Sequence, residues 1–481
     1  MSQQSRFTRR ELIGIGAGAG LVTLAPASWA RVLGANEDIR VAVVGFRGRG
    51  GSLIKAFGSM QGVRLVALCD CDAKVLEKGV QELKDKGTPV TGYADVRQLM
   101  EQKAIDIVAT ATPNHWHSLI TVWACQNGKD VYVEKPVSHC VWEGRQAVAA
   151  ARKYGRIVQA GTQSRSNAAW REAWAWLAEG HIGSIKVSRG LCYKRRASIG
   201  KVDGPQPIPE GVDYDLWCGP AQKLPLMRRS LHYDWHWVWN TGNGDIGNQG
   251  IHQMDIARWA LGKMELPRTV MSIGGRLGYV DDGETANTQM AVFDYGDSQI
   301  IFEVRGLPER SGAVEMPQYF GQRVGNVIEC EGGYIAGNQA FDRTGRLIKT
   351  FTGNGFRGGD HFANFIEAVR SRRVSDLNAD ILDGHLSSAL CHLGNISYRL
   401  GKEADPEALQ AAVRTDGAAM ETLARMEEHL AANGVDIKAT KLRVGPVLRL
   451  DPKRERFIGN RAANAMLHDA YRPGFVVPER V

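Results

Sequence analysis

The sequence predicts a two-part α/β protein: a doubly wound parallel sheet, then an α+β domain with a large, mainly antiparallel open sheet. Three observations predict it. Short β-branched runs alternate with helical segments up to about residue 160. A glycine-rich turn, Gly45–Gly51, separates the first run from the first helix. After about residue 184, runs of alternating polarity are separated by turn glycines, which is typical of half-buried strands.

Composition narrows the class of protein. The 481 residues, 43% hydrophobic and 23% charged, suffice for two or three globular domains. The net charge is +8, but lysines and arginines are spread without a dense run or interleaved aromatics, so no nucleic-acid partner is expected. The eight cysteines form no CxxC pair and show no zinc-like spacing, so we expect free buried thiols and no metal site.

The first 30 residues have the features of a twin-arginine signal peptide. Arg9 and Arg10 precede a short Gly/Ala-rich run that ends at Ala27–Ala30, with cleavage expected near Ala30. Pro26 interrupts this run, which is too short for a membrane anchor, and no later stretch approaches the roughly 20 apolar residues of a spanning helix. We therefore expect a periplasmic or otherwise exported protein with no stable membrane insertion.

The first domain, residues 38–160, begins with the pattern of a dinucleotide-binding unit. A strand at 39–44 leads into the glycine turn, a helix at 52–60 follows, and a strand at 63–69 ends in Asp70, 25 residues after the first glycine. This order is the Rossmann fingerprint: glycines let the backbone approach a pyrophosphate, the helix N-terminus offers free N–H groups, and the acid accepts ribose hydroxyls. An arginine replaces the usual second glycine, so an ordinary glycine turn remains an alternative here. The cofactor-binding residues expected in the turn are Gly45, Arg47, Gly48, Arg49 and Gly50.

Asp70 also predicts which dinucleotide is bound. Asp72 adds a second negative charge where the 2′-phosphate of NADP would lie, and no arginine stands beside the two acids in the sequence. We expect NAD as the cofactor, with NADP disfavoured.

Strand–helix alternation continues and brings more polar groups to strand ends. Strands are expected at 105–112, 130–136 and 157–160, with a helix at 143–153. In a doubly wound sheet the ligand lies at the C-terminal ends of the strands. The further cofactor-binding residues expected there are Thr112, Asn114, His117, Glu134 and Lys135.

The second domain is predicted to span residues 161–401, followed by a C-terminal extension, 402–481, that packs on the core. Its strands are expected at 185–191, 269–273, 287–293 and 299–304. Helical spacing at 361–369 and 387–400 predicts two helices that pack back against the first domain.

The densest cluster of chemically versatile residues runs from His232 to Trp239. Aromatic faces stack on sugar C–H groups and neighbouring polar groups fix hydroxyls, so this segment suits a carbohydrate cleft. Its three tryptophans also have the period of a strand, and a core or interface strand is an equal alternative. The candidate substrate-binding residues are Tyr233, Trp235 and His236.

A helix is expected next, with Asn248, His252, Asp255 and Trp259 on one face. Taking a hydride from an alcohol carbon requires a base at the hydroxyl. His252 can be that base, and Lys135 can polarise or deprotonate the same oxygen; these two are the predicted catalytic residues. The alternative for His252 is a structural histidine paired with Asp255. Asn248 and Asp255 are expected to bind or orient the substrate.

Several motifs, taken in order, resemble those of the Gfo/Idh/MocA oxidoreductases, the family of glucose–fructose oxidoreductase and inositol dehydrogenase. From about residue 38 to the C-terminus they are the glycine turn, Thr112-Pro113-Asn114-x-x-His117, Glu134-Lys135-Pro136, Asp213 to Ala221, Gly247 to Asp255 and Gly384 to Gly401. The resemblance implies a second domain whose sheet covers the cofactor site with one face and packs against another subunit with the other, hence a homo-oligomer, dimer or tetramer. Many relatives have Asp-x-x-x-His where this chain has Asn248 and His252, which leaves Lys135 with His252 as the implied catalytic groups.

These observations predict an NAD-dependent oxidoreductase acting on a hydroxyl of a sugar, glycoside or cyclitol. Free dinucleotide is not expected to be plentiful outside the cytoplasm, so the cofactor should be held tightly, with residues 31–38 or the C-terminal extension covering its adenosine. Two alternatives stay open. One is a redox-neutral glycosidase, lyase or epimerase that oxidises the sugar transiently; the other is a non-catalytic sugar- or dinucleotide-binding sensor.

Overall fold

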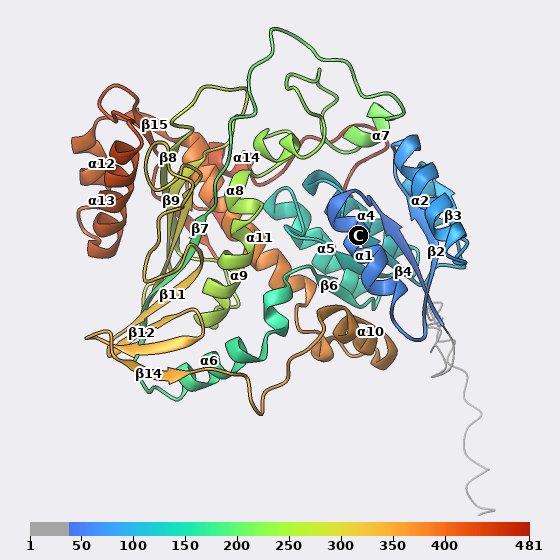
Figure 1. Ribbon diagram of the computed structural model, residues 1–481, viewed down its shortest axis with the longest axis horizontal. Helices are drawn as coiled ribbons and strands as arrows, with labels where there is room; N and C mark the ends of the chain where they lie inside the picture. The colour runs from blue at the N-terminus through green and yellow to red at the C-terminus, as the bar shows by residue number, and fades with distance from the viewer. Residues whose placement is uncertain (1–37) are drawn as a thin grey trace, which may run out of the picture. The chain divides into compact units, whose positions relative to one another are not determined.

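The computed structural model describes residues 38–481. The signal predicted at 1–30 and nearly all of the arm at 31–38 lie outside the described residues. Within the described part the chain forms two sheets, and the predicted fold class is confirmed (Figure 1). No helix of residues 38–481 combines the length and the apolar character that crossing a membrane requires.

The first sheet is parallel throughout, with its six strands in the order β3-β2-β1-β4-β5-β6. Helices cover both faces, which is why its central strands are nearly continuous apolar runs. The strands are β1 (Ile39–Val44), β2 (Val63–Cys69), β3 (Thr91–Tyr93), β4 (Ile107–Thr110), β5 (Asp130–Val133) and β6 (Val158–Ala160). The connecting helices are α1 (Gly48–Gly58), α2 (Ala73–Asp85), α3 (Val96–Met100), α4 (Asn114–Gln126) and α5 (Val141–Lys153).

Two late helices return to this domain, as their sequence predicts. α10 (His361–Ser371) packs beside α1, where the rings of Phe57 and Phe365 meet edge to face with centres 6.3 Å apart. α11 (Ile381–Leu400) packs against α5 on the opposite face. The nucleotide-binding sheet is therefore completed by residues far beyond position 160.

The second sheet has twelve strands, and the long path among them runs β14-β13-β12-β11-β7-β10-β9-β8-β16-β15. Neighbouring strands are antiparallel except β7 and β10, which are parallel. Its strands are β7 (Ile185–Tyr193), β8 (Thr269–Gly275), β9 (Thr288–Asp294), β10 (Gln299–Arg305), β11 (Val324–Cys330), β12 (Gly333–Ala336), β13 (Gln339–Asp342), β14 (Leu347–Thr350), β15 (Lys402–Ala404), β16 (Leu442–Val444), β17 (Leu448–Asp451) and β18 (Arg456–Phe457).

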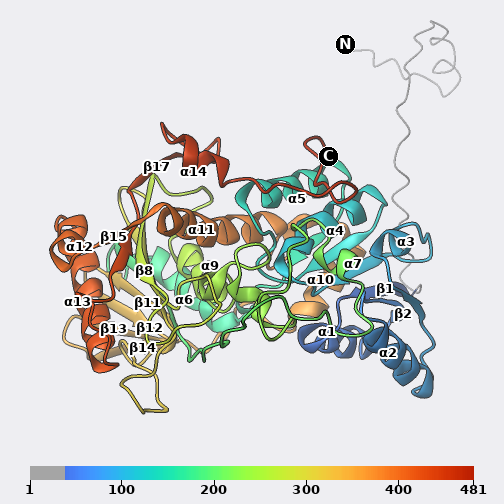
Figure 2. The same ribbon diagram turned by 90° about the horizontal axis from the view of Figure 1, so that it is seen from above.

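Helices pack on both faces of this sheet. α9 (Gly250–Ala260) and α11 cover the face toward the first domain, and α6 (Ala168–Ala178) lies nearby. α12 (Pro406–Val413) and α13 (Gly417–Ala432) cover the other face, where Leu423 and Leu430 pack on Ile301 (Figures 1 and 2). The resemblance implies that this second face packs against another subunit. Over these strands the chain's own helices occupy it, and oligomerisation stays a prediction.

Residues 402–481 belong to both domains. They add β15, β16 and β17 to the large sheet and supply α12 and α13. The remainder, with α14 (Arg461–Ala465), runs back to the first domain. There the Phe475 ring meets Trp116 of α4 at 5.6 Å between centres, and Asp469 lies 2.6 Å from Nδ1 of His139. We call residues 466–481 the tail.

Candidate functional site

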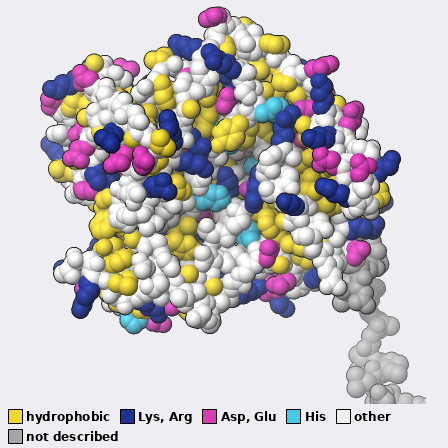
Figure 3. Space-filling model, in the orientation of Figure 1, with side chains coloured by type: hydrophobic (Ala, Val, Ile, Leu, Met, Phe, Trp, Pro, Cys, Tyr) yellow, Lys and Arg dark blue, Asp and Glu magenta, His cyan; other side chains and the backbone are white. Residues whose placement is uncertain are grey.

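A cavity of about 490 Å³ opens between the C-terminal ends of the first sheet and segments of the second domain. The space-filling view is hollowed between the two (Figure 3). The predicted site residues that line the cavity are Gly45, Arg47, Gly48, Arg49, Asp70, Thr112, Asn114, His117, Glu134, Lys135, Tyr233, Trp235, His236 and Asn248. Gly50, His252 and Asp255 do not line it.

The glycine turn has a backbone that a side chain would obstruct. Gly45 has φ +72°, and a Cβ on it would lie 2.8 Å from the side chain of Thr112. A Cβ on Gly50 would lie 2.1 Å from the carbonyl oxygen of Gly45. Gly50 therefore serves the close packing of turn and helix, while the start of α1 at Gly48 presents backbone N–H groups to the cavity. This cradle fits the pyrophosphate of a dinucleotide.

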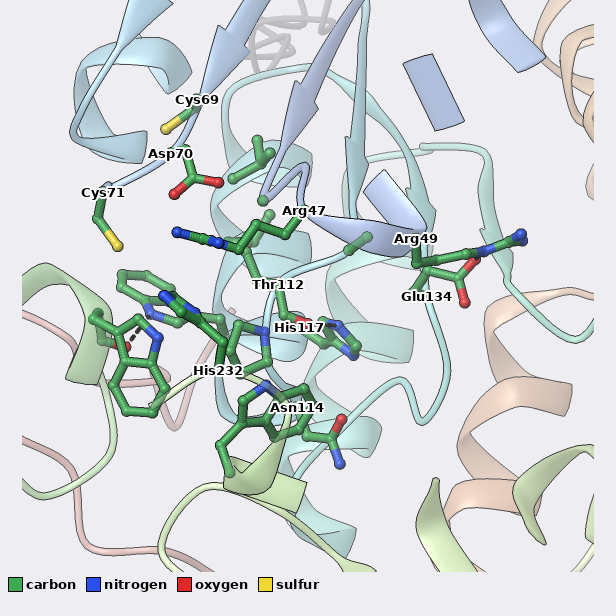
Figure 4. A pocket seen from close by; sticks show the side chains of 18 of the residues that line it. Arg47, Arg49, Cys69, Asp70, Cys71, Thr112, Asn114, His117, Glu134 and His232 are labelled. Carbon is green, nitrogen blue, oxygen red and sulfur yellow. Dashed lines mark hydrogen bonds and ion pairs between the residues drawn. The ribbon is translucent and has the colours of Figure 1, made fainter. Parts of the chain in front are cut away.

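Asp70 directly follows β2 and lines the cavity (Figure 4). Its carboxylate accepts hydrogen bonds from the backbone N–H groups of Phe46, at 3.2 Å, and Asp72, at 3.0 Å. Burial raises the pKa of Asp70 above its ordinary value. The carboxylate is thus fixed in place, with lone pairs remaining for ribose hydroxyls.

Arg47 corrects one prediction. No arginine was expected near the two acids, but the turn after β1 lies beside the end of β2, and the Arg47 guanidinium forms an ion pair with Asp72. The cavity end that holds Asp70 therefore carries a cation as well as two carboxylates.

Glu134 lies at the opposite side of the cavity from Asp70 and is already partnered. Its Oε1 accepts a hydrogen bond from Arg49 Nε at 2.7 Å and another from Gln163 Nε2 at 3.3 Å (Figure 4). Gly161 leaves room for it, because a Cβ there would lie 2.8 Å from the carboxyl group. Glu134 thus ties the end of β5, just before Lys135, to Arg49 of α1 and to Gln163.

Asn114 and His117 build the cavity wall. The His117 ring lies between two carbonyl oxygens, with Nδ1 2.5 Å from Pro136 and Nε2 2.8 Å from Thr112. Burial lowers the pKa of His117, and a neutral ring has one N–H, which it can donate to either carbonyl. Asn114 Nδ2 donates to Oδ1 of Asn243 at 2.9 Å. His117 thus links the segments that follow β4 and β5, while Asn114 links the first domain to Asn243, just before α8.

Lys135 is half-buried, and its ammonium points to the second domain. Nζ donates a hydrogen bond to the backbone carbonyl of Asn248 at 2.7 Å. Burial lowers the pKa of Lys135, while Glu134 and Asp245 oppose that shift. A lysine with a lowered pKa is suited to exchange a proton with a substrate oxygen.

That carbonyl is available because the predicted helix is interrupted. α8 (Gly244–Gly247) ends before Asn248, which has φ −86° and ψ −82°, and α9 begins at Gly250. The prediction that Asn248 and His252 share one helical face is therefore wrong. The break exposes the carbonyl of Asn248 to Lys135, while Asn248 itself lines the cavity.

His252 lies in the first turn of α9 and does not line the cavity. Burial, and then the charge of Lys135, lower the pKa of His252 well below its ordinary value, so the ring is neutral at pH 7. Its alternative role, a structural pair with Asp255, is wrong. Asp255 is fully buried and binds Arg165 Nε at 2.8 Å and Ser387 Oγ at 2.7 Å, which also removes it from the substrate-binding residues.

The aromatic segment forms a 3₁₀ turn, Asp234–Trp237, and the strand alternative is wrong. Tyr233 enters this turn with φ +64°, a strained value for a non-glycine residue. The rings of Trp235 and His236 stack with centres 3.6 Å apart, and Arg196 Nη1 donates to the Tyr233 hydroxyl at 3.0 Å. Tyr233, Trp235 and His236 thus present a rigid aromatic wall to the cavity.

A segment of the second domain crosses the cavity to the first domain. Residues 205–240, which we call the strap, follow β7 in the chain, include α7 (Tyr214–Cys218) and lie beside α2 (Figure 1). The N–H of Ala73 donates to Gly211 at 2.9 Å, and the N–H of Asp213 donates to Cys71 at 2.9 Å.

The strap supplies lining residues that were not predicted from the sequence, namely Leu216, Trp217 and His232. Trp116 of the first domain, which also lines the cavity, donates its indole N–H to the carbonyls of Leu216 and Trp217 at 3.1 and 3.2 Å. The Asp213–Ala221 motif was the available signal, but its position over the cofactor end depends on tertiary contacts. Of the segments expected to cover the adenosine, residues 31–37 lie outside the described part of the chain, and neither Asp38 nor the C-terminal extension contributes to the lining. The strap does contribute to it.

Two family models match the chain. They are described as an oxidoreductase family with an NAD-binding Rossmann fold, over residues 39–162, and an oxidoreductase family C-terminal alpha/beta domain, over residues 183–306. Together they cover just over half of the chain.

Relatives and solved structures share parts of it. A glycosyl hydrolase family 109 protein of Saccharopolyspora erythraea is 30% identical over 178 residues, 32% of this chain and 39% of that protein. An alpha-N-acetylgalactosaminidase of Shewanella oneidensis is 31% identical over 150 residues, 29% of this chain and 33% of that protein. The matches thus span between a third and two fifths of these relatives. The WlbA dehydrogenase of Chromobacterium violaceum, solved with NADH and UDP-GlcNAcA, shares the fold: TM-score 0.57, 19% identity, 76% of this chain and 95% of that one.

Proposed function

Because this chain belongs to the Gfo/Idh/MocA family of NAD-binding oxidoreductases, we propose that it oxidises a hydroxyl carbon of a sugar, glycoside or cyclitol with a tightly held NAD. The observation that carries the proposal is the half-buried ammonium of Lys135, which lines the cavity and is anchored on the carbonyl of Asn248, while His252 follows in the next helix, where the charge of Lys135 helps to lower its pKa. The glycine cradle and Asp70 fit the dinucleotide, which when bound supplies the hydride acceptor.

The two side chains have complementary tasks. The neutral His252 ring accepts the hydroxyl proton as the C–H hydrogen leaves with its electron pair, and Lys135 hydrogen-bonds to the same oxygen. In the reverse direction the same groups return the proton. The aromatic wall of Tyr233 and Trp235 suits the C–H face of a sugar ring. A panel of sugars mixed with the loaded protein tests this proposal. Reduction of the nicotinamide by at least one sugar supports it, whereas binding without any spectral change indicates a sensor.

The strap supports tight retention. It joins the first domain through backbone hydrogen bonds on either side of α2's start and buries Trp217 against the cofactor end of the cavity. The tail holds it from outside, because Arg472 Nη1 donates to the carbonyl of Asp215 at 3.0 Å and Gln222 Nε2 donates to that of Ala470 at 2.7 Å. A dinucleotide under the strap leaves only if these contacts open.

We expect the purified protein to keep its dinucleotide through extensive dialysis and to turn over without added NAD. Retention at nanomolar protein requires roughly −12 kcal/mol or better. Mass spectrometry of the denatured protein measures the content. Trp217→Ala should empty the site, while Met227→Ala, at an exposed strap residue outside the lining, should not. A wild-type protein that is empty after dialysis and works only with added NAD contradicts tight retention.

Replacing Asp70 tests cofactor choice. Asp70→Ser removes a charged acceptor for the ribose hydroxyls and should weaken NAD binding by roughly 10–100-fold. The difference between the affinities for NAD and NADP should become smaller, because Arg47 remains beside the 2′ position and can bind a phosphate. Adding Arg47→Ala should reverse that narrowing. Affinities are compared by calorimetry on protein refolded without cofactor; equal affinities of the unmodified protein for NAD and NADP would show that Asp70 does not select.

A second candidate is a redox-neutral glycosidase, which the names of the two curated relatives favour. Ordinary glycosidases use paired carboxylates across the scissile bond. Among residues 38–481 the cavity carboxylates are Asp70, Asp72, Asp95 and Glu134, and Glu134 is held by Arg49. Cleavage of a glycosidic bond in this cavity would then depend on transient oxidation of the sugar beside Lys135. Release of the leaving group from an aryl glycoside with no net nicotinamide reduction distinguishes this reaction from dehydrogenation.

A further inference from the structure

A second lysine stands beside the catalytic pair. Lys194 directly follows β7, and its Nζ donates a hydrogen bond to Oε1 of Gln249 at 2.9 Å. The preceding residue, Asn248, receives Nζ of Lys135 on its carbonyl at 2.7 Å. Two ammonium groups, one from each domain, are therefore anchored on consecutive residues in the break between α8 and α9.

The carboxylates near these lysines are engaged by other cations. Asp245 is almost fully buried and binds Arg196 through both oxygens, at 2.6 and 2.9 Å. Glu134 binds Arg49 at 2.7 Å. Within residues 38–481, neither Lys135 nor Lys194 has a carboxylate within ion-pair distance.

The charged groups that lower the pKa of His252 are positive as well. After burial, the groups that lower its pKa are Lys135, Arg49, Lys194 and His361, all of them basic. In Figure 3, Lys and Arg side chains lie along the upper side of the hollow. Beside the break, the cations Lys135, Lys194, Arg49 and Arg196 outnumber the carboxylates Glu134 and Asp245. An excess of positive charge favours an anionic group over a neutral one at the same position.

We propose that the substrate is an anionic saccharide, whose carboxylate, sulfate or phosphate group binds Lys194 while the reacting hydroxyl lies at Lys135 and His252. This rests on the proposed function and names its substrate class. The dinucleotide's own phosphates have a separate partner, the backbone cradle at Gly45–Gly48 in the first domain. Lys194 belongs to the second domain and is an exposed residue outside the lining; its partner Gln249 adjoins the lining residue Asn248.

The test compares matched sugars on the NAD-loaded protein. Glucose and galactose are paired with glucuronate and galacturonate, with their 6-sulfates and with their 6-phosphates. Nicotinamide absorbance gives kcat and KM, and tryptophan fluorescence gives binding without turnover. We expect at least one anionic member to exceed its neutral counterpart by about 10–100-fold in kcat/KM, mainly through KM, and the preference to shrink as salt is added.

Three variants assign the preference to Lys194. Lys194→Gln should raise KM for the anion and leave kcat and the neutral sugar nearly unchanged. Gln249→Glu should do the same, because it places a carboxylate next to the intact lysine. Lys194→Arg should retain the preference. Lys402→Gln, an exposed lysine on β15 of the large sheet, is the control for a generic loss of charge.

Each outcome decides the proposal. Neutral sugars that match every anionic partner, or a preference that survives both Lys194→Gln and Gln249→Glu, overturn it while leaving the oxidoreductase proposal intact. No nicotinamide reduction by any sugar, together with saturable anion-selective fluorescence, supports the anionic site and contradicts the proposed reaction. Loss of dinucleotide from Lys194→Gln assigns the lysine to the cofactor and also overturns it.

Discussion

Lys135→Ala is expected to lower the rate of hydride transfer by roughly 10²–10⁴-fold while leaving the dinucleotide bound. The ammonium is anchored on the carbonyl of Asn248 beside the cavity, whereas the cradle and Asp70 hold the cofactor from other strand ends. Losing Lys135 removes a hydrogen bond to the reacting oxygen and leaves the binding contacts of the dinucleotide in place.

Single-turnover reduction of the bound nicotinamide measures this effect, and mass spectrometry measures the retained cofactor. Lys103→Ala is the matched control, because Lys103 is exposed and lies shortly before the start of β4, at the N-terminal ends of the strands and away from the cavity lining. If the variant reduces the nicotinamide at the wild-type rate, Lys135 is not catalytic and the catalytic site does not lie at the end of β5.

His252→Ala is expected to cause a loss of similar order, about 10²–10⁴-fold, with a characteristic pH signature. Burial and Lys135 hold the pKa of His252 below its ordinary value of 6.5, so the wild-type ring is an active base at neutral pH. The rate of the wild-type enzyme should fall only at pH values below this lowered pKa, where the ring becomes protonated. The variant should lack this acid limb, and added imidazole should restore part of its rate.

The control for this variant is His181→Ala, an exposed histidine paired with Glu179 beyond the end of α6. An unchanged acid limb in His252→Ala would assign the titration to another group. A rate that falls without any change in pH dependence would make His252 a positioning residue rather than the base.

The sequence predicted the first sheet closely, because a parallel sheet covered on both faces needs continuous apolar strands. The predicted runs at 39–44 and 63–69 are β1 and β2. Strand alternation likewise located β7 to β10. Their parallel or antiparallel pairing, and the addition of β15 to β17 from the chain's end, depend on long-range contacts that no local pattern encodes.

Site residues that depend on local backbone were predicted better than those that depend on partners. The residues of the turn from Gly45 to Arg49 and Lys135 at a strand end line the cavity, since their places follow from chain geometry, whereas Gly50 does not line it. Asp255 was misassigned because its partner, Arg165, is 90 residues away. The absence of an arginine near Asp70 and Asp72 was wrongly expected for the same reason, because Arg47 follows a different strand from Asp72, its partner.

The tail lies far along the sequence from the strap, yet it holds the strap in place. Arg472 is the guanidinium partner of Asp215, Gln222 donates a hydrogen bond to the carbonyl of Ala470, and Phe475 packs against Trp116. Removing residues 466–481 would therefore free the strap without changing any residue that lines the cavity. We expect such a shortened chain to bind dinucleotide reversibly, so that dialysis empties it.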